Sequence, residues 1–142
     1  NLMPFFPIYY NGNTKFSPLH VSDLAEIILS IIEKKISSEI IECVGPEEIS
    51  FKEILNKLLF SIKKKKILIP FPIFLAKLSA LFFELFPKPL LTRDQLRLLK
   101  YDNVLSGNYK SNIDIGYKPK LKFEDQIEKY SYMWRDGGEY SK

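Results

Sequence analysis

Apolar residues recur at three- and four-residue spacing in two stretches of the first half of the chain, and each stretch opens with a helix-capping signal. Ser50 and Glu53 form a Ser-x-x-Glu capping box, in which each side chain bonds the backbone N–H of the other residue. The apolar positions behind this box are Phe51, Ile54, Leu55, Leu58, Leu59 and Ile62. Asp23, with Glu26 as its capping-box partner, precedes a similar series, which consists of Leu24, Ile27, Ile28, Ile31 and Ile32. The pattern predicts two amphipathic helices, the first starting at Asp23 and the second at Ser50.

Two further helices are predicted in the second half of the chain. Thr92 and Gln95 form a third capping box, and the apolar positions behind it are Leu96, Leu98 and Leu99. The spacing over residues 123–134 predicts a final helix with Ile127 and Tyr130 facing inward.

A long apolar run covers residues 73–86 and, counted from Ile67, approaches the roughly 20 residues that a membrane span requires. Its interruptions are Pro70, Pro72, Lys77, Ser79 and Glu84. These leave only about four turns of uninterrupted helix. We therefore expect a helix that packs inside the protein or against a partner, and a membrane span is the least favoured interpretation.

Short extended stretches lie between the predicted helices. Residues 40–44 are β-branched and apolar, which predicts a buried strand that ends at Gly45 and Pro46. Residues 66–69 predict another short strand, and residues 15–18 a short extended piece. Strands that alternate with helices indicate the α/β class.

The composition is that of a single globular domain, and the distribution of charge bears on its partners. The 142 residues are 46% hydrophobic and 27% charged, with a net charge of +4. All basic side chains except Arg93, Arg97 and Arg135 are lysines, and most are spread along the chain, so we expect no nucleic-acid partner. Residues 63–66 are four consecutive lysines. The solvated end of a helix is favoured there over a phosphate-binding patch or a contact with acidic lipid.

The single cysteine and single histidine do not suggest a metal centre. Cys43 lies in an apolar stretch and is interpreted as a buried thiol in a reducing compartment, the cytoplasm. No spacing typical of metal ligands surrounds Cys43 or His20, so we predict no metal site.

Motifs for cofactor binding and catalysis are missing from this sequence. None of the glycines forms the G-x-G-x-x-G loop that lets a backbone approach a pyrophosphate. No tyrosine has a lysine four residues later, the pairing that lowers a tyrosine pKa for proton transfer. A P-loop and a nucleophile elbow are also absent. We therefore predict no catalytic residue and no cofactor-binding residue in this chain.

Two segments resemble the extended and atypical short-chain dehydrogenases. Residues 14–25, TKFSPLHVSDLA, are similar to the place where a strand of that family runs into a Val-x-Asp-hydrophobic-Ala helix start. Residues 42–47, ECVGPE, followed by SFKEI at 50–54, resemble the family's unit of a strand, Gly-Pro-Glu and a Ser/Thr-Phe-x-Glu helix. Both segments are similar to many epimerases and reductases.

A third segment, residues 87–106, resembles one branch of that family, the nucleotide-binding accessory subunit of respiratory complex I and its bacterial homologues. It contains LTRDQL at 91–96 and LLKYDNV at 98–104, and the tail YMWRDGGEY at 132–140 is similar to the same branch. The resemblance covers nearly the whole chain from Leu2 but only the second half of the family's length. It implies the carboxy-terminal part of a Rossmann-like fold, with the last strands of a parallel sheet and a mainly helical substrate-side lobe.

The resemblance also implies a function for the intact protein. That protein would bind NAD(P)H through an amino-terminal half missing here, and would serve as a non-catalytic accessory or assembly subunit of NADH:quinone oxidoreductase. Its partners would be its own Rossmann half and subunits of complex I, at the inner face of the respiratory membrane. A third interpretation, a membrane-surface module, rests only on residues 63–66 next to the apolar run. The start at Asn1 inside an apolar run is interpreted as a truncation, and no cofactor is expected for this chain alone.

The alternative is an active NAD(P)-dependent reductase or a sugar-nucleotide epimerase or dehydratase. A Tyr-x-x-x-Lys pair upstream of this sequence would favour the enzyme, and its loss would favour the accessory subunit. Whether the intact protein is an enzyme is therefore left open.

Five residues are candidates for a site. His20 lies beside the cleft in relatives and is the candidate cleft-facing residue, with ordinary packing or a bond to solvent as its alternative. Arg93 and Arg97 are one helical turn apart and are candidates for binding the carboxylates of a partner protein. Surface ion pairing is the alternative. Trp134 and Tyr140, beside a Gly-Gly pair, are candidate interface anchors, and helix packing is the alternative for Trp134.

Overall fold

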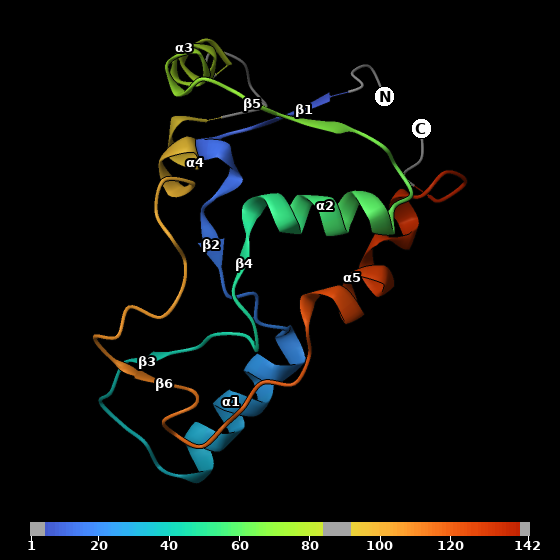
Figure 1. The fold of residues 1–142 in the computed structure, drawn as a ribbon. Helices are drawn as coiled ribbons and strands as arrows, with labels where there is room; N and C mark the ends of the chain where they lie inside the picture. Colours follow the sequence, from blue (N-terminus) through green and yellow to red (C-terminus); the bar gives the residue numbers. More distant parts are fainter. Residues whose placement is uncertain (1–4, 84–91, 140–142) are drawn as a thin grey trace.

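The structure is a computed structural model that describes residues 5–83 and 92–139. Helices and short strands alternate along the chain, which confirms the predicted mixed α/β class (Figure 1). The elements are β1 (Phe5–Ile8), η1 (Tyr10–Gly12), β2 (Lys15–Phe16), α1 (Val21–Glu33), β3 (Ile41–Glu42), β4 (Ile49–Ser50), α2 (Phe51–Ser61), β5 (Ile67–Pro70), α3 (Ile73–Phe83), α4 (Arg93–Leu98), β6 (Lys110–Ser111), α5 (Phe123–Ser131) and η2 (Tyr132–Trp134).

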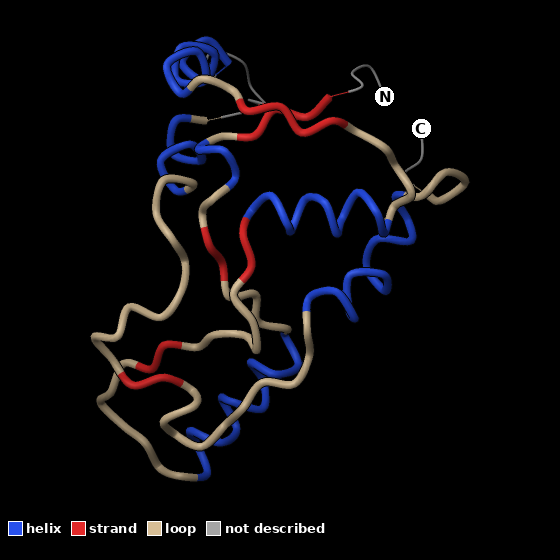
Figure 2. Tube along the Cα trace, in the orientation of Figure 1, coloured by secondary structure: helices blue, strands red, loops and turns tan. Residues whose placement is uncertain are grey.

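The strands form three separate pairs rather than one sheet. β1 and β5 are parallel, β2 and β4 are antiparallel, and β3 and β6 are parallel. Figure 2 shows the β1–β5 pair at one end of the molecule, the β2–β4 pair in the middle and the β3–β6 pair at the other end. Within the described ranges no sheet has more than two strands, so an extended parallel sheet is not formed by these residues alone.

Two of the predicted helix starts are confirmed together with their capping chemistry. The Ser50 hydroxyl accepts the Glu53 N–H, and the Glu53 carboxylate accepts the Ser50 N–H at 2.7 Å. Thr92 and Gln95 form the same reciprocal pair at the start of α4. In both cases the partners lie three residues apart, so the sequence alone contains the whole interaction.

The predicted start of the first helix is wrong by two residues. α1 begins at Val21, because His20 provides the cap: its Nδ1 accepts the Ser22 N–H at 3.1 Å. Asp23 therefore lies inside the first turn, and Glu26 is not its capping-box partner.

Two other differences concern strands. Residues 5–8 were not predicted to be extended, and the strand predicted over residues 40–44 is reduced to β3.

One short stretch, residues 14–18, connects most parts of the molecule. The Phe51 N–H donates to the Thr14 carbonyl at 2.8 Å, which fixes the start of α2. The Asn103 N–H donates to the Lys15 carbonyl at 2.8 Å, and the Lys15 N–H donates to Asp102 Oδ1 at 2.8 Å. Asp102 thus anchors the loop after α4 to β2, in keeping with the tendency of aspartate to bond backbone groups.

Gly45 is required by a close approach to the same stretch. Its N–H donates to the Ser17 carbonyl, and a Cβ atom added at Gly45 would lie 1.7 Å from the Pro18 carbonyl oxygen. Such a distance is far inside van der Waals contact, so only glycine allows the two backbones to pass. Gly45 therefore fixes the path of the chain into His20 and α1.

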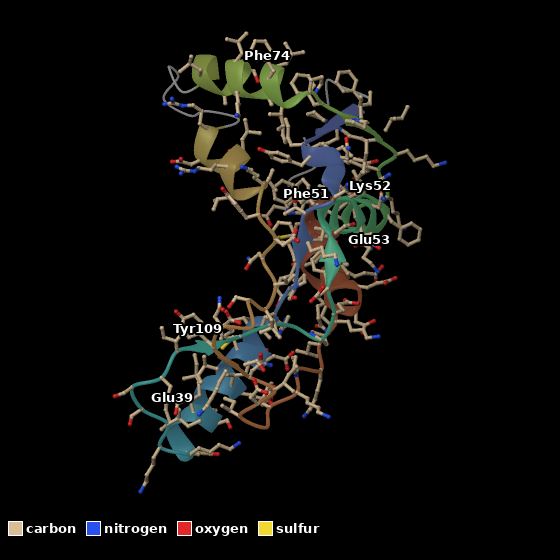
Figure 3. The ribbon with its side chains drawn as sticks, turned by 60° about the vertical axis from the view of Figure 1, so that its left-hand side comes forward. Glu39, Phe51, Lys52, Glu53, Phe74 and Tyr109 are labelled. Atoms are coloured by element: carbon tan, nitrogen blue, oxygen red, sulfur yellow. The ribbon has the colours of Figure 1, made fainter. Side chains whose placement is uncertain are left out.

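α3 packs on α4 along only one side. Ala76 and Ala80 are buried against Leu96, whereas Phe74 points away from the molecule (Figure 3). The remainder of the predicted 73–86 helix lies outside the described residues. Among the helices that the structure describes, none combines the length and the apolar character that crossing a bilayer would demand.

Much apolar surface is uncovered. The chain exposes 10,520 Å², about 40% more than the roughly 7,600 Å² of a compact monomer of 16.6 kDa. α1 illustrates the reason: Ile27 faces inward and is fully buried, but most other apolar side chains of the helix face solvent. These are Val21, Leu24, Ile28, Leu29 and Ile32. A helix that is apolar on its outer side normally packs against another element.

Substitutions on the buried and on the exposed side of α1 should lower the free energy of unfolding by different amounts. Ile27 is 0% exposed and Ile28 is 49% exposed. Replacing Ile27 with Ala should lower the free energy of unfolding by about 3 kcal/mol, because it leaves a cavity. The matched change Ile28→Ala should cost less than about 1 kcal/mol, because that side chain is half in water. Urea unfolding at concentrations where the chain is monomeric measures both; equal losses would show that α1 is oriented differently.

Candidate functional site

A small apolar pocket lies between the stretch that leads into α1 and the first turns of α5. Its volume is about 220 Å³. It is lined by Pro18, Leu19, His20, Leu121, Lys122, Phe123, Gln126, Ile127 and Tyr130. The walls are mainly apolar, with a histidine and a tyrosine as paired polar groups. Such a combination is typical of sites that hold a small ligand by shape and orient it through one polar end.

His20 is held in this pocket at both ring nitrogens. Nδ1 accepts the Ser22 N–H, and Nε2 lies 2.8 Å from the hydroxyl oxygen of Tyr130. Because Nδ1 acts as an acceptor, it carries no proton, and the ring proton is on Nε2. The Nε2–H group therefore donates a hydrogen bond to the Tyr130 hydroxyl oxygen. The hydroxyl proton of Tyr130 is then available to another acceptor. The pair can therefore offer one O–H donor to a carbonyl or carboxylate of a bound molecule.

Tyr130 was predicted to face inward, and this is wrong. Its side chain is 56% exposed and reaches sideways to His20. The buried line of α5 runs through Ile127 and Ser131, four residues apart, and the Ser131 hydroxyl lies 2.6 Å from that of Ser61 on α2. Tyr130 is rotated by about 100° from Ser131 around the helix, which carries it out of the buried line. The orientation of α5 therefore depends on the polar core residue Ser131 as well as on Ile127, and the spacing of the apolar residues did not indicate this.

A buried carboxylate lies next to the pocket and ties α1 to the chain before α5. Asp23 accepts the N–H groups of Leu121 and Lys120 at 3.0 and 3.2 Å, and its other oxygen lies 2.9 Å from the Tyr117 hydroxyl. Tyr117 also lies 2.8 Å from Glu26 Oε2, and with one proton it donates to one carboxylate at a time. The network holds residues 117–121 in place, and these lead directly into the pocket wall.

The network lowers the pKa of Asp23 and raises the pKa of Tyr117. Burial opposes ionisation of Asp23, but the hydrogen bonds from Leu121, Tyr117 and Lys120 outweigh it and lower the pKa of this carboxyl below 3.8. The pKa of Tyr117 is raised, first by burial and then by its bonds to Glu26 and Asp23. Asp23 is therefore an anion, and Tyr117 a neutral donor, at physiological pH. Their role is to position the backbone.

The other candidates from the sequence do not line this pocket. Arg93 and Arg97 are exposed on α4, which Figure 1 places apart from α5. Trp134 is exposed in η2, and Tyr140 lies outside the described residues. The structure therefore brings together His20 and Tyr130, and leaves Arg93, Arg97 and Trp134 elsewhere on the surface.

Residues 5–83 and 92–139 form neither a metal site nor a reactive thiol. In the part of the chain that the structure describes, no three His, Cys, Asp or Glu side chains converge in a way that would hold a metal ion. Cys43 is half-buried, and burial raises the pKa of its thiol, which disfavours the nucleophilic thiolate.

Asp23 makes a strong prediction about stability. Asp23→Ala should lower the free energy of unfolding by about 2 kcal/mol, since it leaves two partly buried N–H groups without their acceptor. The matched change Asp136→Ala removes a 3.7 Å ion pair between the exposed Asp136 carboxylate and Lys64, and should cost less than about 1 kcal/mol.

The contribution of Asp23 should also depend on pH. Because the pKa of Asp23 is lower in the folded protein, its stabilisation is complete well above 3.8 and is lost as pH falls through the folded value. Denaturant titrations at pH 7 and pH 3 test this. Asp23→Ala should flatten the acid limb of the stability curve, and an unchanged limb would contradict the assignment.

Comparison with protein-family models and with curated proteins finds no match to this chain. Its function must therefore be inferred from the residues and from the way in which the structure places them.

Proposed function

We propose that this chain is the carboxy-terminal, substrate-side part of a Rossmann-like, NAD(P)H-binding protein. The observation that carries the proposal is the uncovered apolar side of α1, formed by Val21, Leu24, Ile28, Leu29 and Ile32. Isolated domains rarely leave such a stripe in water, because burying one large aliphatic side chain is worth about 2 kcal/mol. A second body of protein that covers α1 accounts for the stripe.

The strand pairs support the same conclusion. β1–β5 and β3–β6 are parallel, and parallel strands are found almost only inside larger α/β sheets. Among the described residues each of these two pairs has two open edges, which larger sheets avoid. An amino-terminal Rossmann half that adds strands and helices would complete these pairs. That half would also carry the glycine loop and hold the NAD(P)H.

We further propose that the intact protein is a non-catalytic accessory or assembly subunit of NADH:quinone oxidoreductase. The support is the resemblance of residues 87–106 and 132–140, together with the exposure of Arg93 and Arg97 on α4. Planar guanidinium groups on an exposed helix suit the carboxylates of a neighbouring subunit. Trp134 offers a large exposed aromatic surface of the kind that anchors interfaces.

The pocket beside His20 favours a second candidate function, an NAD(P)-dependent reductase, epimerase or dehydratase. The His20–Tyr130 pair would orient a small substrate, and the catalytic tyrosine and lysine would come from the amino-terminal half. If the accessory-subunit proposal is correct, the pocket is a structural remnant or binds a ligand without turnover.

Affinity purification of the intact protein from its own cells separates the two. We expect the wild type to copurify with quinone-oxidoreductase subunits and to release a nicotinamide nucleotide on denaturation. Arg97→Ala and a truncation after Met133 should each reduce the copurified subunits severalfold, because each removes part of the proposed contact surface. Lys118→Ala, an exposed change outside that surface, is the control.

Two outcomes contradict the proposal in different ways. If both variants retain the subunits as well as wild type does, the contact surface is wrongly assigned. If the wild type retains none and turns over a nicotinamide substrate, the enzyme takes the place of the accessory subunit.

A further inference from the structure

The four consecutive lysines form one wall of an open groove. Residues 63–66 connect α2 to β5, and the groove beside them has a volume of about 990 Å³. It is lined by Asn56, Leu59, Phe60, Ser61, Lys63, Lys64, Lys65, Lys66, Ile67, Glu128 and Arg135. The lysines are therefore part of a formed surface, in which large apolar side chains lie on either side of them.

The backbone holds this loop in a defined conformation. The Lys63 N–H donates to the Phe60 carbonyl and the Lys64 N–H to the Leu59 carbonyl, both at 3.0 Å, which is the Schellman arrangement at a helix end. Lys63 occupies the left-handed position of that motif, with φ 56°, where glycine is usual. The motif ends α2 and turns the chain, so the lysines follow one another along the rim of the groove.

The charges of the groove are only partly balanced. Lys64 pairs with Asp136 at 3.7 Å, and Arg135 donates to the Ser61 carbonyl and pairs with Glu128 at 3.4 Å. Lys63, Lys65 and Lys66 have no ion pair with any residue in the ranges 5–83 and 92–139. Three positive charges of this surface are thus left for a partner of opposite sign.

Large apolar side chains flank the lysines on both sides. Phe60 is 84% exposed and precedes them, and Ile67 is 69% exposed and follows them. Ile69 and Phe5 continue the apolar surface, since Ile69 is two residues further along β5 and Phe5 pairs in register with Ile67. The unpaired lysines therefore stand beside an uncovered face of the β1–β5 pair.

We propose that this surface, made of residues 60, 63–67 and 69, docks on an anionic phospholipid bilayer. Lysines at the level of phosphate headgroups gain from the negative surface potential, and Phe60, Ile67 and Ile69 reach the acyl boundary. A polynucleotide would satisfy the charges but leave the aliphatic side chains in water, and the one arginine of the groove is already engaged. The inference rests on this surface alone and does not depend on the proposed function.

Flotation with vesicles tests the proposal on the whole chain. The probes are vesicles of phosphatidylcholine alone and of phosphatidylcholine with 30% phosphatidylglycerol. We expect binding to the anionic vesicles that weakens with salt, and at least tenfold weaker binding to the neutral ones. Replacing Lys63, Lys65 and Lys66 together with Gln should weaken anionic binding by roughly a hundredfold, at about fivefold per lysine.

A matched triple variant and an apolar variant make the test specific. Lys35, Lys118 and Lys120 are exposed and lie outside the groove, and their replacement by Gln removes the same net charge from other places. This control should bind as wild type does. Phe60→Ser should weaken binding severalfold without changing its dependence on salt.

Three results would overturn the proposal. The first is equal binding to neutral and anionic vesicles, which would indicate adsorption through apolar surface alone. The second is an equal loss in the two lysine triples, which would indicate an effect of net charge. The third is binding to a polyanion such as heparin that is tighter than binding to vesicles and insensitive to Phe60→Ser, which would indicate a polyanion site.

Discussion

Residues 14–18 are the connection on which the rest of the structure depends. They bond to the start of α2 through Phe51 and to the loop after α4 through Asp102 and Asn103, and they pass Gly45 so closely that no side chain fits there. In the part of the chain that the structure describes, no sheet has more than two strands, and the buried cluster of Ala76, Ala80 and Leu96 is small. The parts of the molecule therefore keep their places mainly through backbone hydrogen bonds to one extended stretch. The same stretch leads directly to His20, which lines the pocket and caps α1.

The features that the sequence predicted well are those whose interactions are local. The capping boxes at Ser50 and Thr92 join residues three positions apart, and both helices begin where those boxes indicate. Contacts between distant residues could not be anticipated in this way. The bond from the Lys15 N–H to Asp102 spans 87 positions, and the register of β1 on β5 follows from tertiary packing. Such pairings leave little trace in short-range periodicity.

In the candidate site, too, local features could be predicted from the sequence, whereas contacts between distant residues could not. The sequence singled out His20, but histidine is not among the usual helix caps, so its role at the start of α1 was missed. Tyr130 was missed as its partner, because the orientation of α5 is set by the Ser61–Ser131 contact as well as by Ile127. Asp23 was recognised as part of the helix start. Its bonds to residues 120 and 121 depend on a chain reversal that no local pattern encodes.

We propose that, in the intact protein, another body of protein covers the outer side of α1 and the open edges of the parallel strand pairs. Sedimentation velocity of this chain alone, followed over a tenfold range of concentration, tests the claim most directly. If the apolar surface lacks its cover, the chain should self-associate as concentration rises, and coexpression with the amino-terminal half should give a single one-to-one species. A chain that stays a compact monomer over the whole range and melts in one sharp cooperative transition would contradict the claim.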